Sequence, residues 1–138
     1  MPDACNSNGK LVLPSELREL ERVDALTLEC TRKAGLPEDQ AMMVAIAVVE
    51  AVTNGIVHGN NFADDKVVTL EFACKPGLIK VIVHDEGKGF DMTCVWDPTS
   101  PDHQMDCSGR GIYIMREVMD SVEFDMSDGT TVVMTKAV

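Results

Sequence analysis

Residues 41–58, A-M-M-V-A-I-A-V-V-E-A-V-T-N-G-I-V-H, constrain the fold of this chain more than any other segment. Pro37 precedes the stretch, and Glu38 and Asp39 stand where the first turn of a helix favours acidic side chains. The pattern predicts a helix that is apolar nearly all round. Such a helix is buried on most sides, so we expect it to pack against a sheet. Its few polar residues are then the informative ones.

Shorter patterns on both sides predict two more helices and five strands. A helix is expected from Ser15, which we interpret as its N-cap, to Gly35, a typical helix-ending residue. Another is expected at residues 111–119, after a long loop that begins at Asp85 and ends near Ser108. Alternation and turn residues predict strands at residues 10–13, 67–74, 78–84, 122–126 and 131–135.

The order of these elements predicts the fold class. An edge strand stopped by Pro14 comes first, followed by two helices, a strand pair, a long loop, a helix and a second strand pair. This order predicts an α+β sandwich with a mostly antiparallel sheet, and it lacks the strict strand–helix alternation of a Rossmann domain. We expect residues 1–9 to be flexible and residues 10–138 to form one domain.

The charge of the chain limits its partners. Twelve basic and 23 acidic residues give a formal net charge of -11. Such a surface repels phosphate backbones and anionic membranes, which argues against direct binding to nucleic acid or membrane. A site for an anionic nucleotide would therefore need a metal ion, backbone amides and a few local cations.

The cysteines and the apolar runs indicate a compartment. The cysteines are five, an odd number, and none has the C-x-x-C spacing, which favours free thiols in a reducing cytoplasm over disulfides or zinc. The N-terminus shows no charged-then-apolar leader, and we expect no apolar run long enough to span a bilayer. Both observations predict a cytoplasmic protein.

Three polar residues interrupt the apolar helix at a regular spacing. Glu50, Asn54 and His58 are four residues apart, so they lie on one helical stripe with a displacement of about 40° between neighbours. Oxygen ligands of this kind suit Mg²⁺, a hard cation that shares its ligands with phosphates. The alternative is a pair of core polar residues with satisfied partners, or a helix end. His58 precedes Gly59 and Asn60, and in the simpler interpretation it caps the helix C-terminus.

A second polar segment, D-E-G-K-G-F-D at residues 85–91, follows the strand at residues 78–84. Asp85 stands where that strand leaves the sheet, and its carboxylate can accept a hydrogen bond from an exocyclic amine. Gly87 and Gly89 permit close approach of a ligand to the backbone. An acidic turn with two glycines is the alternative interpretation.

Two further segments lie at junctions. Ser108-Gly109-Arg110-Gly111 joins the long loop to a helix, where exposed N–H groups and the helix dipole attract phosphate, and Arg110 adds a cation. An ordinary helix start with an N-cap serine is the alternative. The segment 128–131, D-G-T-T, is explained by a hairpin turn, although a threonine hydroxyl there would face a base edge if the last strands pack beside the site.

The ordered set of four segments resembles the GHKL ATP-binding family of histidine kinases, gyrase and MutL. The segments are E-A-V-T-N-G-I-V-H-G-N, H-D-E-G-K-G-F-D, S-G-R-G-I-Y-I-M and G-T-T-V-V-M-T-K, in a stretch of roughly residues 11–136. The chain looks most like the anti-sigma-factor serine kinases, which have a compact version of the fold. This resemblance implies a Bergerat-type two-layer sandwich with a mixed, mostly antiparallel sheet and helices on one face.

The resemblance also implies roles for individual residues. Asn54 would coordinate Mg²⁺, and Glu50 would be the general base that takes the proton from a substrate serine or water. Asp85 would bind the adenine amine of ATP, and Thr130 would assist through a water molecule. The remaining implied roles are a pocket shaped by Gly87 and Gly89, phosphates held by Gly109, Arg110 and Gly111, and a lid at residues 91–108.

Two departures from the family pattern stand out. Gly55 follows the metal-binding asparagine where the family often has alanine, and a glycine inside a helix costs about 1 kcal/mol relative to alanine. We therefore expect a close backbone contact at Gly55. The segment W-D-P-T-S-P-D-H-Q-M-D-C in the lid is proline-rich and acidic, which fits a subgroup with variable regulatory partners.

Three functional hypotheses follow. In the first, the chain is an ATP-dependent serine/threonine kinase that phosphorylates an anti-anti-sigma protein of the STAS type and so regulates transcription. In the second, it binds ATP without turnover and sequesters a sigma factor or another regulator. The third is a structural domain without a ligand. The resemblance alone suggests a homodimer.

Overall fold

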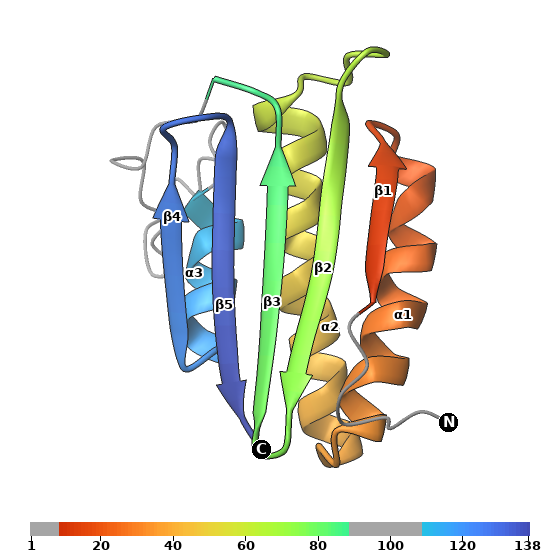
Figure 1. The fold of residues 1–138 in the computed structure, drawn as a ribbon, viewed down its shortest axis with the longest axis vertical. Coiled ribbons are helices and arrows are strands. Elements are labelled where there is room, and N and C mark those ends of the chain that lie inside the picture. The colour runs from red at the N-terminus through yellow and green to blue at the C-terminus, as the bar shows by residue number, and fades with distance from the viewer. Residues whose placement is uncertain (1–8, 89–108) are drawn as a thin grey trace, which may run out of the picture.

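The computed structural model describes residues 9–88 and 109–138, which form one five-stranded sheet with helices on one face (Figure 1). The strand order is β1-β2-β3-β5-β4, and each neighbouring pair is antiparallel. The strands are β1 (Lys10–Pro14), β2 (Val67–Lys75), β3 (Leu78–Asp85), β4 (Ser121–Asp125) and β5 (Thr130–Ala137). The predicted two-layer α+β fold is confirmed, and each predicted strand is found with ends shifted by no more than two residues.

Three α-helices cover the inner face of the sheet. They are α1 (Leu20–Lys33), α2 (Glu38–Asn54) and α3 (Gly109–Val118), with a 3-10 turn η2 (Leu17–Glu19) before α1 and a π-helical turn η3 (Gly55–Gly59) after α2. Helix α2 lies between α1 and α3 and contacts both (Figure 1). The predicted helix end at Gly35 is confirmed by its positive φ of 96° and by its N–H, which donates to the Arg32 carbonyl at 3.0 Å.

The predicted N-cap at Ser15 is wrong. Its hydroxyl is buried and donates to the Lys66 carbonyl at 2.7 Å, far along the chain. The position before η2 belongs to Glu16, whose side chain makes no capping hydrogen bond. Ser15 was misassigned because a serine before a helix has the same local pattern whether its hydroxyl caps the helix or satisfies a distant buried carbonyl.

Strand alternation places the core between sheet and helices. On β2 the side chains of Val68, Leu70, Phe72 and Cys74 point inward and are buried, and the residues between them are half-buried. Most of the inward side of α2 is buried against them, including Val44, Val48 and Val52, which are 0% exposed. Every second residue of the strand and the residues on one face of the helix therefore pack against each other in one apolar layer.

Helix α2 and η3 correct one expectation. Together they form a 22-residue helix, Glu38–Gly59, that is long and apolar enough to cross a membrane by length and composition, whereas we expected no such run. In the structure this helix is the central core helix, and 56% of its most apolar window is buried inside the protein. Core helices of globular proteins pass the same test, because both environments select apolar side chains.

We expect Phe72→Ala to destabilise the chain by about 3–5 kcal/mol, because it removes a large side chain from a site that cannot collapse around the cavity. Phe72 is 0% exposed at the centre of β2. Urea unfolding followed by circular dichroism measures the change. Val12→Ala is the control, since Val12 is 57% exposed on the edge strand and its truncation should change stability by about 0.5 kcal/mol or less. Equal losses in the two variants would contradict this description of the core.

Candidate functional site

The predicted site residues come from four elements whose ends converge. Glu50 and Asn54 lie on the second half of α2, and Gly111 lies in the first turn of α3. A Cβ atom placed on Gly111 would lie 3.0 Å from Asn54 Nδ2 and 3.1 Å from Glu50 Oε1. The start of α3 therefore packs directly on the stripe of α2 that carries the carboxylate and the amide. A side chain at position 111 would fill that space.

Two buried polar atoms in this region have no hydrogen-bond partner among the described residues. They are Asn54 Nδ2, in a side chain 5% exposed, and Thr130 Oγ1, in a side chain 1% exposed. Leaving such a group unpaired costs about 1–3 kcal/mol, so most buried polar atoms are satisfied. Asn54 and Thr130 lie at positions where the sequence predicted contacts to Mg²⁺ and to the nucleotide. Their unmet hydrogen-bonding capacity is what a polar ligand would satisfy.

Asp85 is the buried carboxylate of the site. It ends β3, it is 3% exposed, and it pairs in register with Thr130 at the start of β5. Burial raises the pKa of Asp85, since it disfavours the charged form, while the N–H groups of Gly87 and Thr130 and the charges of His84 and Lys66 act in the opposite direction. The Gly87 N–H donates to Asp85 Oδ1 at 2.9 Å. One edge of the carboxylate is thus held by the backbone.

Glycine backbone surrounds Asp85 closely. A Cβ on Gly59 would lie 2.4 Å from Asp85 Cγ, a Cβ on Gly87 would lie 2.0 Å from the Gly59 carbonyl oxygen, and a Cβ on Gly129 would lie 2.1 Å from the Asp85 carbonyl oxygen. No side chain fits at these distances, so all three positions require glycine. Sequence reasoning predicted that Gly87 lets a ligand approach the backbone, whereas the close contact in the structure is to the Gly59 carbonyl. It missed Gly59 and interpreted Gly129 only as a hairpin turn. A Cβ on Gly55 would be 3.3 Å from Val68 Cγ2, which confirms the expected close contact there.

Asn60 is the residue that sequence reasoning missed most clearly. It is 2% exposed, and its Nδ2 donates to Ser15 Oγ and to the Val67 carbonyl, each at 3.0 Å. Its Oδ1 accepts from the Glu86 N–H at 2.8 Å. Asn60 therefore ties the end of η3 to the chain after β1, the start of β2 and the end of β3. The Gly-Asn pair after the helix was the available signal, and we interpreted it only as a helix end.

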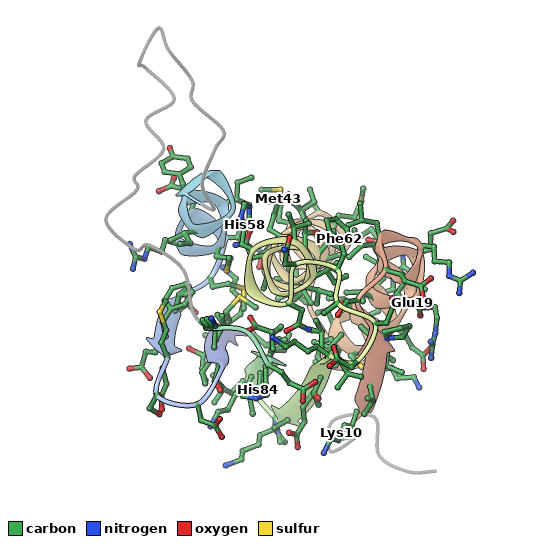
Figure 2. All side chains as sticks on the ribbon, turned by 90° about the horizontal axis from the view of Figure 1, so that it is seen from above. Lys10, Glu19, Met43, His58, Phe62 and His84 are labelled. Carbon is green, nitrogen blue, oxygen red and sulfur yellow. The ribbon has the colours of Figure 1, made fainter. Side chains whose placement is uncertain are left out.

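His58 lies in the last turn of η3, on the side of the molecule where the helices lie (Figure 2). It is half-buried and lines a cavity of about 400 Å³ together with Gly59, Asn60, Asn61, Ala63, Lys66 and Lys88. The position is compatible with the helix-end interpretation. The cavity also brings a histidine and two lysines beside Gly59, which contacts Asp85. The two lysines, Lys66 and Lys88, are local cations of the kind that an anionic ligand needs in an acidic chain.

Part of the predicted site cannot be placed. Gly89, the predicted lid at residues 91–108 and Ser108 lie outside the described residues. Gly109 and Arg110 are the first two residues of α3, so this helix begins two residues before the predicted residue 111. The candidate site is the group of described residues that these contacts bring together: Glu50, Asn54, Gly59, Asp85, Gly87, Gly111, Gly129 and Thr130.

Comparison with known proteins decides the family. A family model described as "Histidine kinase-like ATPase domain" matches residues 13–136. The chain belongs to this family. It is 34% identical over 110 residues to the serine-protein kinase RsbW of Bacillus subtilis, in an alignment that covers 75% of this chain and 69% of RsbW. It is 35% identical over 105 residues to the anti-sigma F factor of Geobacillus stearothermophilus, covering 72% and 70% of the two chains.

Solved structures show the same fold. The RsbU and RsbW domains of a Mycobacterium tuberculosis protein superpose with a TM-score of 0.65 at 16% identity, over 95% of this chain and 32% of that one. The histidine kinase domain of a blue-light activated kinase from Erythrobacter litoralis gives 0.57 at 20% identity, over 89% and 60%. The catalytic domain of the histidine kinase ThkA gives 0.55 at 15% identity, over 94% and 97%. The histidine kinase-like ATPase fold is therefore shown by sequence and by structure.

We expect Asp85→Asn to stabilise the ligand-free chain at neutral pH. Burial raises the pKa of Asp85 in the folded chain above its ordinary value of about 4. The protonated carboxyl therefore adds to the stability of the wild type below pH 4, and this contribution is lost as the pH rises through the raised pKa. The variant's advantage in unfolding free energy should therefore grow as the pH rises from about 4 through the raised pKa, and it should then stay constant. Thermal unfolding from pH 4 to pH 8 measures it.

The control for this prediction is Asp125→Asn. The N–H and hydroxyl of Ser127 donate to Asp125 Oδ1 and lower its pKa, so its ionised form favours folding. The free energy of unfolding of Asp125→Asn should be lower than that of the wild type at neutral pH, and the two values should become equal in acid. If Asp85→Asn behaves like Asp125→Asn, the carboxylate of Asp85 is better solvated than its burial indicates.

Proposed function

We propose that this chain is an ATP-dependent serine/threonine protein kinase of the anti-sigma-factor type. The observation that carries the proposal is the position of Glu50 and Asn54 on one face of α2, against Gly111 at the start of α3, with the buried Asn54 Nδ2 lacking a partner among the described residues. In the proposed reaction the terminal phosphoryl group of ATP passes to a serine oxygen of a partner protein, and ADP leaves. The names of the relatives, serine-protein kinase RsbW and anti-sigma F factor, support this reaction class.

Glu50 is the proposed general base. It is half-buried, one helical turn before Asn54, so its carboxylate is accessible from the protein surface and adjoins the proposed nucleotide site. A base must come within about 2.6–3.2 Å of the hydroxyl whose proton it takes. Glu50 would accept the serine proton as the oxygen bonds to phosphorus. The other site residues position the nucleotide and neutralise charge, which is most of what phosphoryl transfer requires from a protein.

Asn54 is the proposed ligand of Mg²⁺. An amide offers an oxygen to the cation and an NH2 group to a phosphate oxygen, and the NH2 group of Asn54 has no partner among the described residues. The amide oxygen would supply one ligand of the metal, and phosphate oxygens and water would supply the others. When bound, Mg²⁺ would offset the charge of the phosphates in this acidic chain. Gly109, Arg110 and Gly111 would hold those phosphates at the helix start.

Asp85 and Thr130 are the proposed adenine contacts. The exocyclic amine of adenine is a donor, and a carboxylate such as that of Asp85, one oxygen of which accepts from the Gly87 N–H, has further acceptor capacity for it. The buried hydroxyl of Thr130 lies on the strand paired with Asp85 and has capacity for a bridging water. Gly87 and Gly89 would shape the wall of this pocket, and residues 91–108 would form its lid.

The proposed partner is an anti-anti-sigma protein of the STAS type, and a sigma factor is a further partner in the same switching scheme. A homodimer and a cytoplasmic location belong to the same proposal. Residues 10–138 would form the single catalytic domain. The net charge of -11 supports protein partners over nucleic acid or an anionic membrane.

We expect Asn54→Ala to weaken ATP binding in the presence of Mg²⁺ by roughly tenfold or more, about 1.4 kcal/mol. Without Mg²⁺ the variant and the wild type should differ much less, because the lost oxygen acts on the metal. Titration calorimetry with ATP, with and without Mg²⁺, measures this. Thr53→Ala is the matched control, since Thr53 Oγ1 donates back to the Val49 carbonyl at 2.6 Å. No ATP binding by the wild-type chain under either condition would end the proposal.

We expect Glu50→Gln to bind Mg-ATP with unchanged affinity and to lower phosphoryl transfer by about 10²–10⁴-fold, the usual contribution of a general base. Transfer is measured with labelled ATP and a purified STAS-domain protein from the same genome. A wild-type chain that forms a nucleotide-dependent complex with that protein, yet transfers no phosphate, would instead favour the binding switch. Thr53→Ala again serves as the control.

A further inference from the structure

Helix α2 presents an exposed apolar stripe that leads to Glu50. Met42, Met43 and Ile46 are 53%, 49% and 46% exposed, although the opposite side of the helix forms the core. Met43 and Ile46 stand seven and four residues before Glu50, so all three share one helix face. Figure 2 shows Met43 on the side of α2 that faces away from the sheet. Tyr113 of α3 is a further exposed apolar side chain, at 37%.

A cavity adjoins this stripe. It has a volume of about 300 Å³ and is lined by Gln40, Met43, Glu117, Val118 and Lys136, between α2, α3 and the end of β5. Met43 therefore belongs both to the stripe and to the cavity wall. A cavity of this size beside exposed methionines can accept an apolar side chain, because the unbranched methionine side chain adapts its shape to what it contacts.

We infer that the stripe of Met42, Met43 and Ile46, with its cavity, is the docking surface for the protein that carries the phosphorylated serine. The inference rests on the proposed function and names the part of the surface that selects the partner. The serine oxygen must come within hydrogen-bond reach of Glu50, so the protein that carries it covers the surface around Glu50. The apolar side chains adjoining Glu50 towards the N-terminus of α2 are the members of this stripe.

Charge determines what kind of surface fits the stripe. Asp39 of α2 and Glu117 of the cavity wall are exposed, Lys136 of the same wall lies 3.9 Å from the carboxylate of Asp120, and the chain carries a net charge of -11. A second copy of this chain docked on this stripe would bring two acidic rims together, which opposes a homodimer formed through this particular surface. The occupant is therefore a different protein, with an apolar side chain for the cavity and basic or neutral residues around it. Its acceptor serine would lie about two to three helical turns away from that anchor, since Met43 and Gln40 of the cavity wall stand seven and ten residues before Glu50.

Methionine oxidation tests the inference without depending on turnover. In the isolated chain, peroxide should oxidise Met42 and Met43 quickly and the buried Met115 and Met134, both 0% exposed, slowly. Addition of a purified STAS-domain anti-anti-sigma protein, with a non-hydrolysable ATP analogue, should slow the oxidation of Met42 and Met43. Mass spectrometry of peptides gives all four rates in one experiment.

Three results of that experiment would overturn the inference. Slow oxidation of Met42 and Met43 in the dilute isolated chain would mean that another part of this chain covers them. Protection that grows with the concentration of this chain alone would make a second copy the occupant. Oxidation unchanged by the STAS-domain protein would remove the docking role. Protection in this experiment, combined with no phosphoryl transfer when the same two proteins are incubated with Mg-ATP, would instead refute the proposed kinase activity and leave the docking surface in place.

Steady-state kinetics of matched variants give a second test of the docking surface. The double substitution Met43→Gln with Ile46→Gln should raise the KM for the STAS-domain protein by roughly tenfold or more, as loss of an interface anchor does. The KM for ATP should not change, since neither residue belongs to the nucleotide site. Leu17→Gln is the control, because Leu17 is a similarly exposed apolar residue, at 47%, located on η2. An unchanged KM for the STAS-domain protein, or an equal rise in the control, would overturn the inference.

Discussion

The burial of Asp85 is the constraint on which the rest of this site depends. The carboxylate can be buried only because glycine backbone from η3 and from the segments that follow β3 and precede β5 approaches it within distances that exclude any side chain. Those close contacts require η3, the end of β3 and the start of β5 to lie against one another. Asn60 holds that point together through three hydrogen bonds to segments far apart in the sequence. The fold and the site are therefore consequences of the same close contacts.

The site carries polar groups that the folded chain leaves incompletely satisfied. Asp85 is desolvated, and Asn54 and Thr130 each bury an atom without a partner among the described residues. Each of these features disfavours folding. The apolar side of α2 and the inward residues of the strands offset them with the burial of large side chains. One helix thus serves both purposes: most of its surface stabilises the fold, while one stripe keeps the polar groups available to a ligand.

The acidic character of the chain shapes both of its proposed interactions. A net charge of -11 opposes the approach of a nucleotide, and the cations that line the cavity beside Gly59, namely Lys66 and Lys88, act against that field locally. The start of α3 adds backbone N–H groups, which attract an anion without the desolvation of a charged side chain. On the outer side of α2, the same acidic surface restricts partners to proteins that are neutral or basic around an apolar anchor.

The sequence by itself determined the elements, their order and most of the residues of the candidate site. Periodicity and turn residues depend on local hydrogen bonding and local burial, so they placed the strands and the helix end at Gly35 correctly. The order of four short segments pointed to the family before any contact was known. Tertiary structure alone decided that Ser15 bonds to Lys66 instead of capping a helix, and that Gly59, Gly129 and Asn60 surround and support Asp85. It also decided which side of α2 remains exposed. These contacts join residues far apart in the chain, and their distances depend on strand register and helix packing, which no local pattern encodes.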